Sequence, residues 1–90
     1  MKRPSTKGIK DIMCLLYGRR CFVCRKRFDK LQYHHMIPFS QGGETTIANG
    51  ALLCKQCHWE LENTDKKSEY KHKIIAYKEE IEYKNSIKFA

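Results

Sequence analysis

The hydrophobic and polar positions of the chain predict a helix near each end, with short strands between them. The first helical pattern starts where Ser5 or Thr6 can cap a helix and stops at Gly18. Its apolar face carries four residues at helical spacing: Ile9, Ile12, Met13 and Leu16. Cys14 points away from this face, so we expect it to be a free thiol without an assigned role.

The second helical pattern predicts a longer helix over residues 65–83. One side of it carries four large apolar or aromatic residues at helical spacing: Tyr70, Ile74, Tyr77 and Ile81. Two pairs of opposite charges stand four residues apart on it: Glu69–Lys73 and Glu80–Lys84. His72 has no partner in this pattern, and we expect it on the surface.

The middle of the chain predicts two short strands followed by a third helix. Leu31 and Tyr33 begin a strand that must stop near Pro38, because proline cannot extend a strand ladder. A loop over 40–49 then leads to a second strand at 51–53 and a helix over 55–62.

The expected fold is therefore a small α+β protein with a ββα core and a helix at each end. Ninety residues support a single domain, so we expect one domain over residues 1–90. Residues 64–90 would form its C-terminal helical extension.

Four of the five cysteines form two Cys-x-x-Cys pairs, Cys21/Cys24 and Cys54/Cys57, with twenty-nine residues between them. Each pair fits a tight turn that presents two thiolates to one Zn²⁺ at about 2.3 Å, and four thiolates complete a closed tetrahedral shell. A chain this short buries a thin core and often needs such a staple, so we expect a structural zinc. A redox dithiol or two disulfides are the alternatives, but a redox motif normally stands in a βαβ context that is absent here.

The charge pattern indicates a polyanionic partner. The chain holds 18 Lys and Arg against 10 Asp and Glu, a net charge of +8, and residues 1–59 carry the whole excess. Six basic residues opposed only by Asp29 cluster around the first cysteine pair, and we assign DNA binding to them: Arg19, Arg20, Arg25, Lys26, Arg27 and Lys30. A merely solvated basic face is the alternative.

A set of polar residues lies between the cysteine pairs or directly after them. His34 and His35 are neighbours on a predicted strand, so their side chains point to opposite sides and can serve separate purposes. His58 follows Cys57 directly, so a zinc-bound turn would fix its position. Asn49 in the loop can both donate and accept hydrogen bonds that tie loop to strand. A plain zinc ribbon needs no such set.

These residues together resemble the signature of the HNH, or ββα-metal, endonuclease family. The matching stretches are Tyr-His-His-Met-Ile-Pro at 33–38, Gly-Gly at 42–43 and Asn-Gly-Ala-Leu-Leu-Cys-Lys-Gln-Cys-His at 49–58. The resemblance implies a ββα-metal (His-Me finger) core over residues 21–61. It implies His34 and His58 as ligands of a catalytic metal, His35 as the general base and Asn49 as the residue that positions the base strand. Many relatives carry Asp at the position of His34, which would leave two neutral ligands and no carboxylate.

The resemblance implies hydrolysis of a DNA phosphodiester bond, by nicking or double-strand cleavage, to a 5′ phosphate and a 3′ hydroxyl. A histidine ionises near neutral pH, which suits a general base, and one divalent ion (Mg²⁺, Mn²⁺, Ni²⁺ or Zn²⁺) would act as a Lewis acid. Two alternatives remain open: a non-catalytic zinc-ribbon adaptor that binds nucleic acid, and an interaction module that uses Trp59 and the tyrosines of the last helix. We expect Trp59 to pack into the thin core instead.

DNA is the expected partner, and a second copy of the chain or a phage or bacterial DNA-processing protein is a further candidate. No secretory apolar segment follows residues 1–8, and no run approaches the ~20 apolar residues of a membrane span. We therefore expect no membrane association and a cytoplasmic, DNA-associated protein of phage or bacterial origin.

Overall fold

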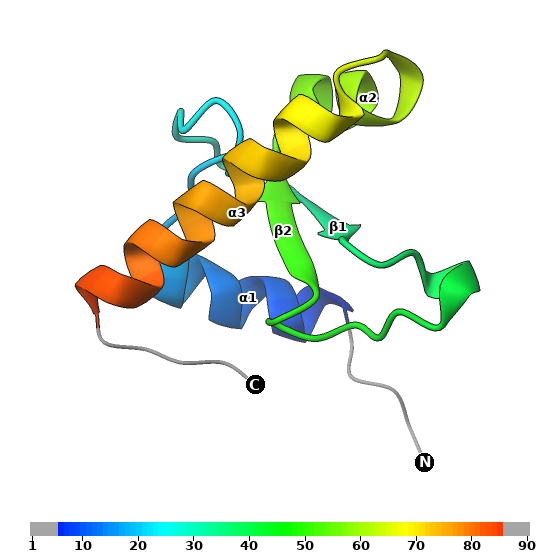
Figure 1. Ribbon diagram of the computed structural model, residues 1–90. Coiled ribbons are helices and arrows are strands. Elements are labelled where there is room, and N and C mark those ends of the chain that lie inside the picture. Colours follow the sequence, from blue (N-terminus) through cyan, green and yellow to red (C-terminus); the bar gives the residue numbers. More distant parts are fainter. Residues whose placement is uncertain (1–5, 86–90) are drawn as a thin grey trace.

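The computed structural model describes residues 6–85 and confirms the predicted α+β class, with three α-helices and a two-stranded antiparallel sheet (Figure 1). The elements in chain order are α1 (Thr6–Tyr17), β1 (Gln32–His35), a single 3₁₀ turn (Phe39–Gln41), β2 (Gly50–Leu53), α2 (Lys55–Asn63) and α3 (Lys67–Lys84). Ser5, one of the two residues expected to cap the first helix, lies outside the described residues.

The two strands form an antiparallel pair in which Gln32 faces Leu53 and His35 faces Gly50. Side chains alternate along β1 because the period of a strand is two residues. Gln32 and His34 therefore face α2, and Tyr33 and His35 face the loop that follows the 3₁₀ turn. All four residues of β2 are buried, so β2 anchors the sheet in the core while β1 carries polar side chains along its length.

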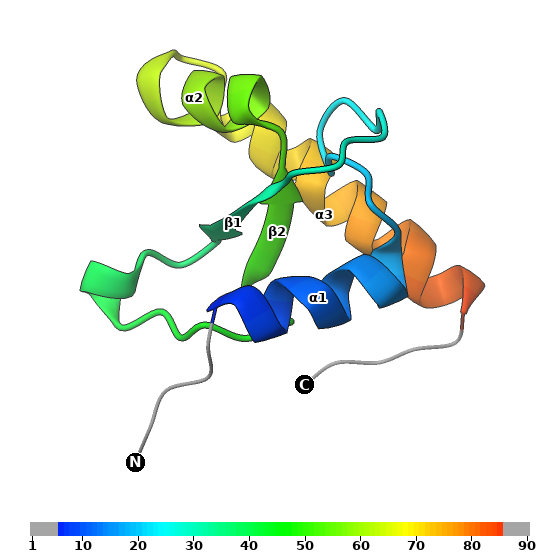
Figure 2. The same cartoon turned by 180° about the vertical axis from the view of Figure 1, so that it is seen from behind.

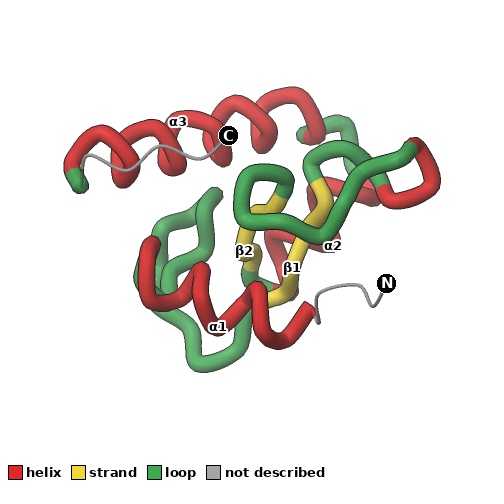
Figure 3. Tube along the Cα trace, turned by 90° about the horizontal axis from the view of Figure 1, so that it is seen from below, coloured by secondary structure: helices red, strands yellow, loops and turns green. Residues whose placement is uncertain are grey.

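The core lies where α1 and α3 meet the sheet, and the strands lie between these two helices in Figure 3. Phe22 is fully buried at its centre, with its ring 5.1 Å from that of Tyr17 on α1 and 4.9 Å from that of Tyr77 on α3. The Tyr77 hydroxyl donates to the backbone oxygen of Tyr17 at 2.7 Å. Burying aromatic rings with their polar ends satisfied stabilises a small core efficiently.

The buried face of α1 is rotated from the expected one. Met13 and Tyr17 are the buried residues of this helix, while Ile12 is 43% exposed. Cys14, expected to point away, is half-buried and packs against the core. The prediction missed Tyr17: its ring must meet Phe22, and this turns the helix toward the side of Cys14 and away from that of Ile12.

Trp59 corrects a second expectation. Its side chain is 61% exposed on α2 rather than packed in the core. The helix instead buries Cys57 and Leu61, which face the opposite way. The first turn of α2 is tied to the cysteine cluster, since Cys54 caps the helix and accepts a hydrogen bond from the Cys57 backbone N–H, and this orientation leaves Trp59 outside.

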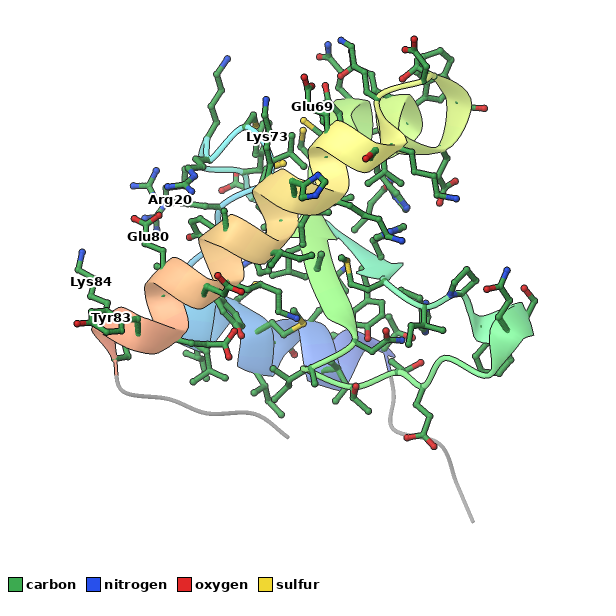
Figure 4. The ribbon with its side chains drawn as sticks, in the orientation of Figure 1. Arg20, Glu69, Lys73, Glu80, Tyr83 and Lys84 are labelled. Carbon is green, nitrogen blue, oxygen red and sulfur yellow. The ribbon has the colours of Figure 1, made fainter. Side chains whose placement is uncertain are left out.

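Helix α3 buries its predicted face, with Tyr70, Ile74 and Tyr77 inside. Of its two expected charge pairs, Glu69–Lys73 is present at 3.9 Å, and both side chains are labelled in Figure 4. Glu80 pairs with Arg25 at 2.7 Å instead of with Lys84. The long-range pair links α3 to the first cysteine turn. Within residues 6–85, no helix has both the length and the apolar character that crossing a membrane requires.

Candidate metal centres and active site

The four paired cysteines come together at one end of the sheet, although two of them lie in a loop and two at the start of α2. Their sulfur atoms all lie within 4.8 Å of one another. The first pair sits in the turn at 21–24, which approaches the start of α2 in the view from behind (Figure 2). The Phe22 backbone N–H donates to the Leu52 backbone oxygen at 2.8 Å, and this hydrogen bond joins the turn to β2. None of the five cysteines forms a disulfide, so all four sulfurs of the cluster are available to one metal ion.

The cysteine cluster fits a closed, structural metal site. Cys21, Cys54 and Cys57 are buried, and Cys24 is partly so. Backbone N–H groups of Val23 and Cys57 point at the sulfurs of Cys21 and Cys54, both at 3.4 Å, as happens where thiolates bind a cation.

The pKa values of these thiols describe the same environment. Burial raises the pKa of Cys24 and of Cys57. Burial also acts to raise the pKa of Cys21, but backbone hydrogen bonds in the two cysteine turns bring it below its usual value. The thiols of Cys24 and Cys57 therefore resist ionisation, and a bound cation would supply the countercharge that favours their thiolate forms.

A second donor cluster joins β1 to α2 and contains His34, His58 and Glu62. The His58 Nε2 lies 3.0 Å from Glu62 Oε1, and the His34 Nδ1 lies 4.0 Å from that same oxygen. The two imidazole rings stand edge to face with centroids 5.4 Å apart. Glu62 follows His58 by one helical turn on α2, which places both side chains on one face. The donor atoms of the three residues lie within 4.8 Å of one another, so the cluster could hold a divalent ion.

The surroundings of the two histidines suit metal binding. Burial lowers the pKa of His34 to about 4, with a smaller contribution in the same direction from His58, so its ring is neutral at pH 7. His58 Nδ1 donates to Gln32 Oε1 at 2.6 Å, so Nε2 is the ring nitrogen turned toward Glu62. Such hydrogen bonds to the far nitrogen commonly orient metal-binding histidines.

His35 faces away from this cluster but lines the same cavity, a space of about 420 Å³ between β1, α2 and α3. Its Nε2 forms a hydrogen bond of 2.9 Å with the Thr45 hydroxyl. Its ring packs edge-on against Tyr33 at 4.7 Å and against Phe39 at 6.1 Å. Contacts on several sides hold the ring in place while it stays partly exposed to the cavity.

Asn49 ties the loop to the strand that carries the histidines. Its Oδ1 accepts from the Ile37 backbone N–H at 2.8 Å, and its Nδ2 donates to the backbone oxygens of Ile37 at 3.1 Å and Glu44 at 2.9 Å. The Asn49 backbone oxygen also accepts from the Met36 N–H at 2.8 Å. One amide side chain thus closes a loop that begins directly after His35.

Two glycines permit close approaches around this loop. A Cβ on Gly43 would stand 1.8 Å from the Ile37 backbone oxygen, and a Cβ on Gly50 would stand 2.5 Å from the Tyr33 ring. A larger residue at position 43 would force the loop away from the Ile37 backbone, and a larger residue at position 50 would displace the Tyr33 ring. Of the two adjacent glycines in the sequence motif, Gly43 therefore has a steric role.

Lys78 supports the same loop from α3. Its side chain is buried, and its ammonium group donates to three backbone oxygens, those of Ile47 at 3.0 Å, Ala48 at 2.9 Å and Gly50 at 2.8 Å. Burial lowers the pKa of Lys78. These acceptors flank Asn49, so the last helix braces the loop that Asn49 closes.

Two further lysines of α3, Lys67 and Lys71, line the histidine cavity. The six basic residues expected to bind DNA lie instead around the first cysteine turn, and all six are exposed. Arg25 is engaged in its pair with Glu80 and lies over the Tyr77 ring at 5.2 Å. Positive charge therefore borders both regions, and DNA binding by the six residues remains a prediction.

The fold and the site together define a ββα unit with two separate clusters of metal-binding side chains. A model of the HNH endonuclease family matches residues 21–64, which include both clusters. A protein named Anaredoxin, from Nostoc sp. (strain PCC 7120 / SAG 25.82 / UTEX 2576), is 38% identical over 56 residues, which cover 62% of this chain and 68% of that protein. The chain belongs to the HNH endonuclease family. This membership indicates a nuclease-like or nucleic-acid-related function.

The sequence grouped His34 with His58, and the structure brings them together, with His35 lining the same cavity. Asn49 lies outside that cavity and acts on the loop that follows His35. The prediction from sequence missed Glu62, and with it the carboxylate that the site was expected to lack. It also missed Gln32, Thr45 and the α3 lysines. The spacing of four residues between His58 and Glu62 on one predicted helix was a signal that could have revealed the third donor.

Proposed function

We propose that this protein is an HNH endonuclease that hydrolyses phosphodiester bonds of DNA with one catalytic divalent metal. The observation that carries the proposal is the convergence of a metal-competent trio and a separately held imidazole on one open cavity. His34, His58 and Glu62 form the trio, and His35 lines the same space. A cavity with both features has what phosphoryl hydrolysis needs: a place for a cation and a base for water.

The chain's own residues have distinct roles in this proposal. His35 takes a proton from the attacking water, and its contacts with Thr45 and Tyr33 hold the ring in a fixed position. Asn49 keeps the loop closed on the strand that carries His35. Lys67 and Lys71 face the anionic backbone of the substrate from the far wall of the cavity.

The trio is well suited to a catalytic divalent metal. Two neutral imidazoles and one carboxylate match the donor set that Zn²⁺, Mn²⁺, Ni²⁺ and related ions accept, and Glu62 also supplies the hard oxygen that Mg²⁺ prefers. When bound, the ion would act as a Lewis acid toward a phosphate oxygen and the departing 3′ oxygen. Glu62 is 57% exposed on its side chain, so the site is open on the side where substrate enters.

The cysteine cluster has a structural role in this proposal, with Zn²⁺ as its ion. Four sulfurs fill a tetrahedral shell and leave no position for substrate. The cysteine site would thus stabilise the fold, and the histidine site would bind the catalytic metal.

The test is nicking of supercoiled plasmid by His35→Ala across a panel of divalent metals. Removing a general base typically lowers the rate by about 10²–10⁴-fold, and we expect a loss in that range for every metal. His72→Ala is the matched control, because His72 is exposed on α3 and bonds only to its own helix at Ser68; it should cut like the wild type. Zinc content, circular dichroism and DNA binding should be unchanged in both variants.

Two results would contradict the proposal. If His35→Ala cuts as fast as the wild type, the base has been assigned wrongly. If the wild type cuts no DNA with any metal yet binds it, the protein is a zinc-ribbon adaptor that keeps the HNH scaffold without catalysis. The name of the relative Anaredoxin describes no nuclease, so the adaptor is the alternative that the experiment must separate.

A further inference from the structure

A groove beside the cysteine cluster has no part in the proposed chemistry. It has a volume of about 550 Å³ and is lined by Phe28, Lys30, Cys54, Lys55, Gln56 and Trp59. Trp59 is 61% exposed and Phe28 is partly buried beside it. A large indole left in solvent on a small protein is a feature that commonly marks a contact surface.

The groove and the histidine cavity flank the same helix. Lys55 and Trp59 stand one turn apart on α2, just as His58 and Glu62 do. Successive residues of a helix point about 100° apart, so the face with Trp59 adjoins the face with His58. A polymer bound along one face of α2 therefore has a short path to the other.

The charges in the groove indicate the chemistry of its occupant. Lys30 and Lys55 line it together with the two aromatic rings, and none of its lining residues is acidic. Lysines beside an exposed indole match a ligand that carries a phosphate next to a flat ring. Nucleobases in a duplex are already stacked on one another, whereas an unpaired base offers its ring to an aromatic side chain.

We propose that Trp59 is a stacking platform for an unpaired nucleobase and that Lys30 and Lys55 hold the phosphates of the same strand. The proposal rests on the proposed nuclease function and refines it, because it makes single-stranded DNA, or DNA with an unpaired base beside the cut, the preferred substrate.

The intrinsic tryptophan fluorescence of the protein reports on this contact directly, because Trp59 is its only tryptophan. The experiment titrates zinc-loaded protein, without a second metal, with short oligothymidylate and follows the indole fluorescence. An abasic strand of equal length and charge is the first control, and a blunt duplex is the second. Oligothymidylate should quench the emission and bind about tenfold more tightly than the abasic strand, since stacking of one base on an aromatic ring is worth about that factor.

Variants separate stacking from charge. Trp59→Ala, followed by fluorescence anisotropy of labelled DNA, should remove most of the preference for oligothymidylate while leaving affinity for the abasic strand and the duplex nearly unchanged. Trp59→Phe should keep much of the preference. Lys55→Gln should weaken binding of oligothymidylate and the abasic strand alike. Because Trp59 is exposed, Trp59→Ala should retain its zinc and its thermal midpoint, and both are measured.

Three results would overturn the proposal. They are an indole emission that oligothymidylate leaves unchanged, an unaltered preference in Trp59→Ala, and an emission that shifts with protein concentration alone, which would mark the groove as a contact between copies. None of them depends on cleavage. Loss of the quenching would leave the nuclease proposal standing, and normal cleavage by His35→Ala would leave the stacking contact standing.

Discussion

The protein holds two clusters of metal-binding side chains that differ in how they are built. The cysteine cluster consists of four thiols of one kind, three of them buried, contributed by two tight turns. The histidine cluster consists of two imidazoles and a carboxylate, contributed by a strand and a helix, and it opens onto a cavity of about 420 Å³. The first is closed and the second is open.

The difference shows what positions the side chains of each cluster. The four thiols come from two segments far apart in the sequence, and Cys21, Cys54 and Cys57 belong to the buried core, so one bound ion would join the two segments. The histidine cluster is positioned by the protein itself, because Gln32 orients His58, and Asn49 and Lys78 fix the loop beside it. An open site can exchange water and substrate only if its shape does not depend on the ion alone.

The variant with the largest expected effect is Cys54→Ser, which tests whether the cysteine cluster is a structural metal site. It removes one of four thiolates but leaves a side chain that can still cap α2, so the variant tests the metal itself. The binding energy of a structural zinc, about 10 kcal/mol or more, is folding energy. We expect loss of zinc by elemental analysis and loss of the cooperative thermal transition. Cys14→Ser is the matched control and should keep both. A folded Cys54→Ser with a wild-type midpoint would show that the cysteine cluster is not a staple.

The next variant asks whether the protein positions the open site. Lys78→Met keeps the volume of the side chain but removes a donor from three backbone oxygens, of which that of Ile47 still accepts from the Gly50 N–H at 3.3 Å. Buried acceptors without partners cost about 2–3 kcal/mol in sum, which for a chain of this size lowers the thermal midpoint by roughly 8–20 °C. Lys73→Met, on an exposed face of the same helix, should change stability by less than about 0.5 kcal/mol.

Denaturant unfolding with zinc present should find Lys78→Met less stable than Lys73→Met. Equal stabilities would contradict the claim that the protein itself positions the open site. A stable variant would mean that the loop of Asn49 holds its shape without α3. We also expect slower cleavage in Lys78→Met, since the loop next to His35 loses its support.

A smaller effect concerns the carboxylate of the open cluster. Glu62→Gln keeps the shape and removes the charge, and losing one ligand or its support typically weakens metal affinity by about 10–100-fold. We expect calorimetry with Mn²⁺ to show this loss at the histidine cluster, with no change in tightly bound zinc. Glu69→Gln, an exposed carboxylate paired with Lys73, is the control. Equal Mn²⁺ affinities for both variants would remove Glu62 from the site.

The parts of the fold that could be predicted depend on short-range patterns. The cysteine pairs, the strands, the order of elements and the buried face of α3 all follow from spacing within a few residues. The histidine motif could be recognised for the same reason, since its residues stand in three short stretches close along the chain.

The parts that could not be predicted depend on which elements meet. The face of α1 turned because Tyr17 meets Phe22, a residue of a loop beyond the helix. Trp59 lies outside because the cysteine cluster orients α2. Residues 60–90 carry no net charge, so their composition did not point to nucleic acid, yet α3 brings Lys67 and Lys71 to the histidine cavity.

The smallest expected effect comes from a comparison of two basic regions. One is the pair of α3 lysines at the histidine cavity, and the other is the group of basic residues around the first cysteine turn. Lys71→Gln removes a cation from the wall of the proposed active site, and Lys26→Gln removes one from the cysteine turn. Each should lower the dependence of DNA affinity on salt by about one phosphate contact, a slope of ~0.9 on duplex DNA. Only Lys71→Gln should also slow single-turnover cleavage at saturating DNA, because only that charge lines the cavity of His35. Lys73→Gln, two residues from Lys71 and on the opposite side of α3, belongs to neither region and should change neither quantity. If Lys26→Gln slows cleavage and Lys71→Gln does not, the scissile phosphate lies beside the cysteine turn, and the open cluster is not where DNA is cut.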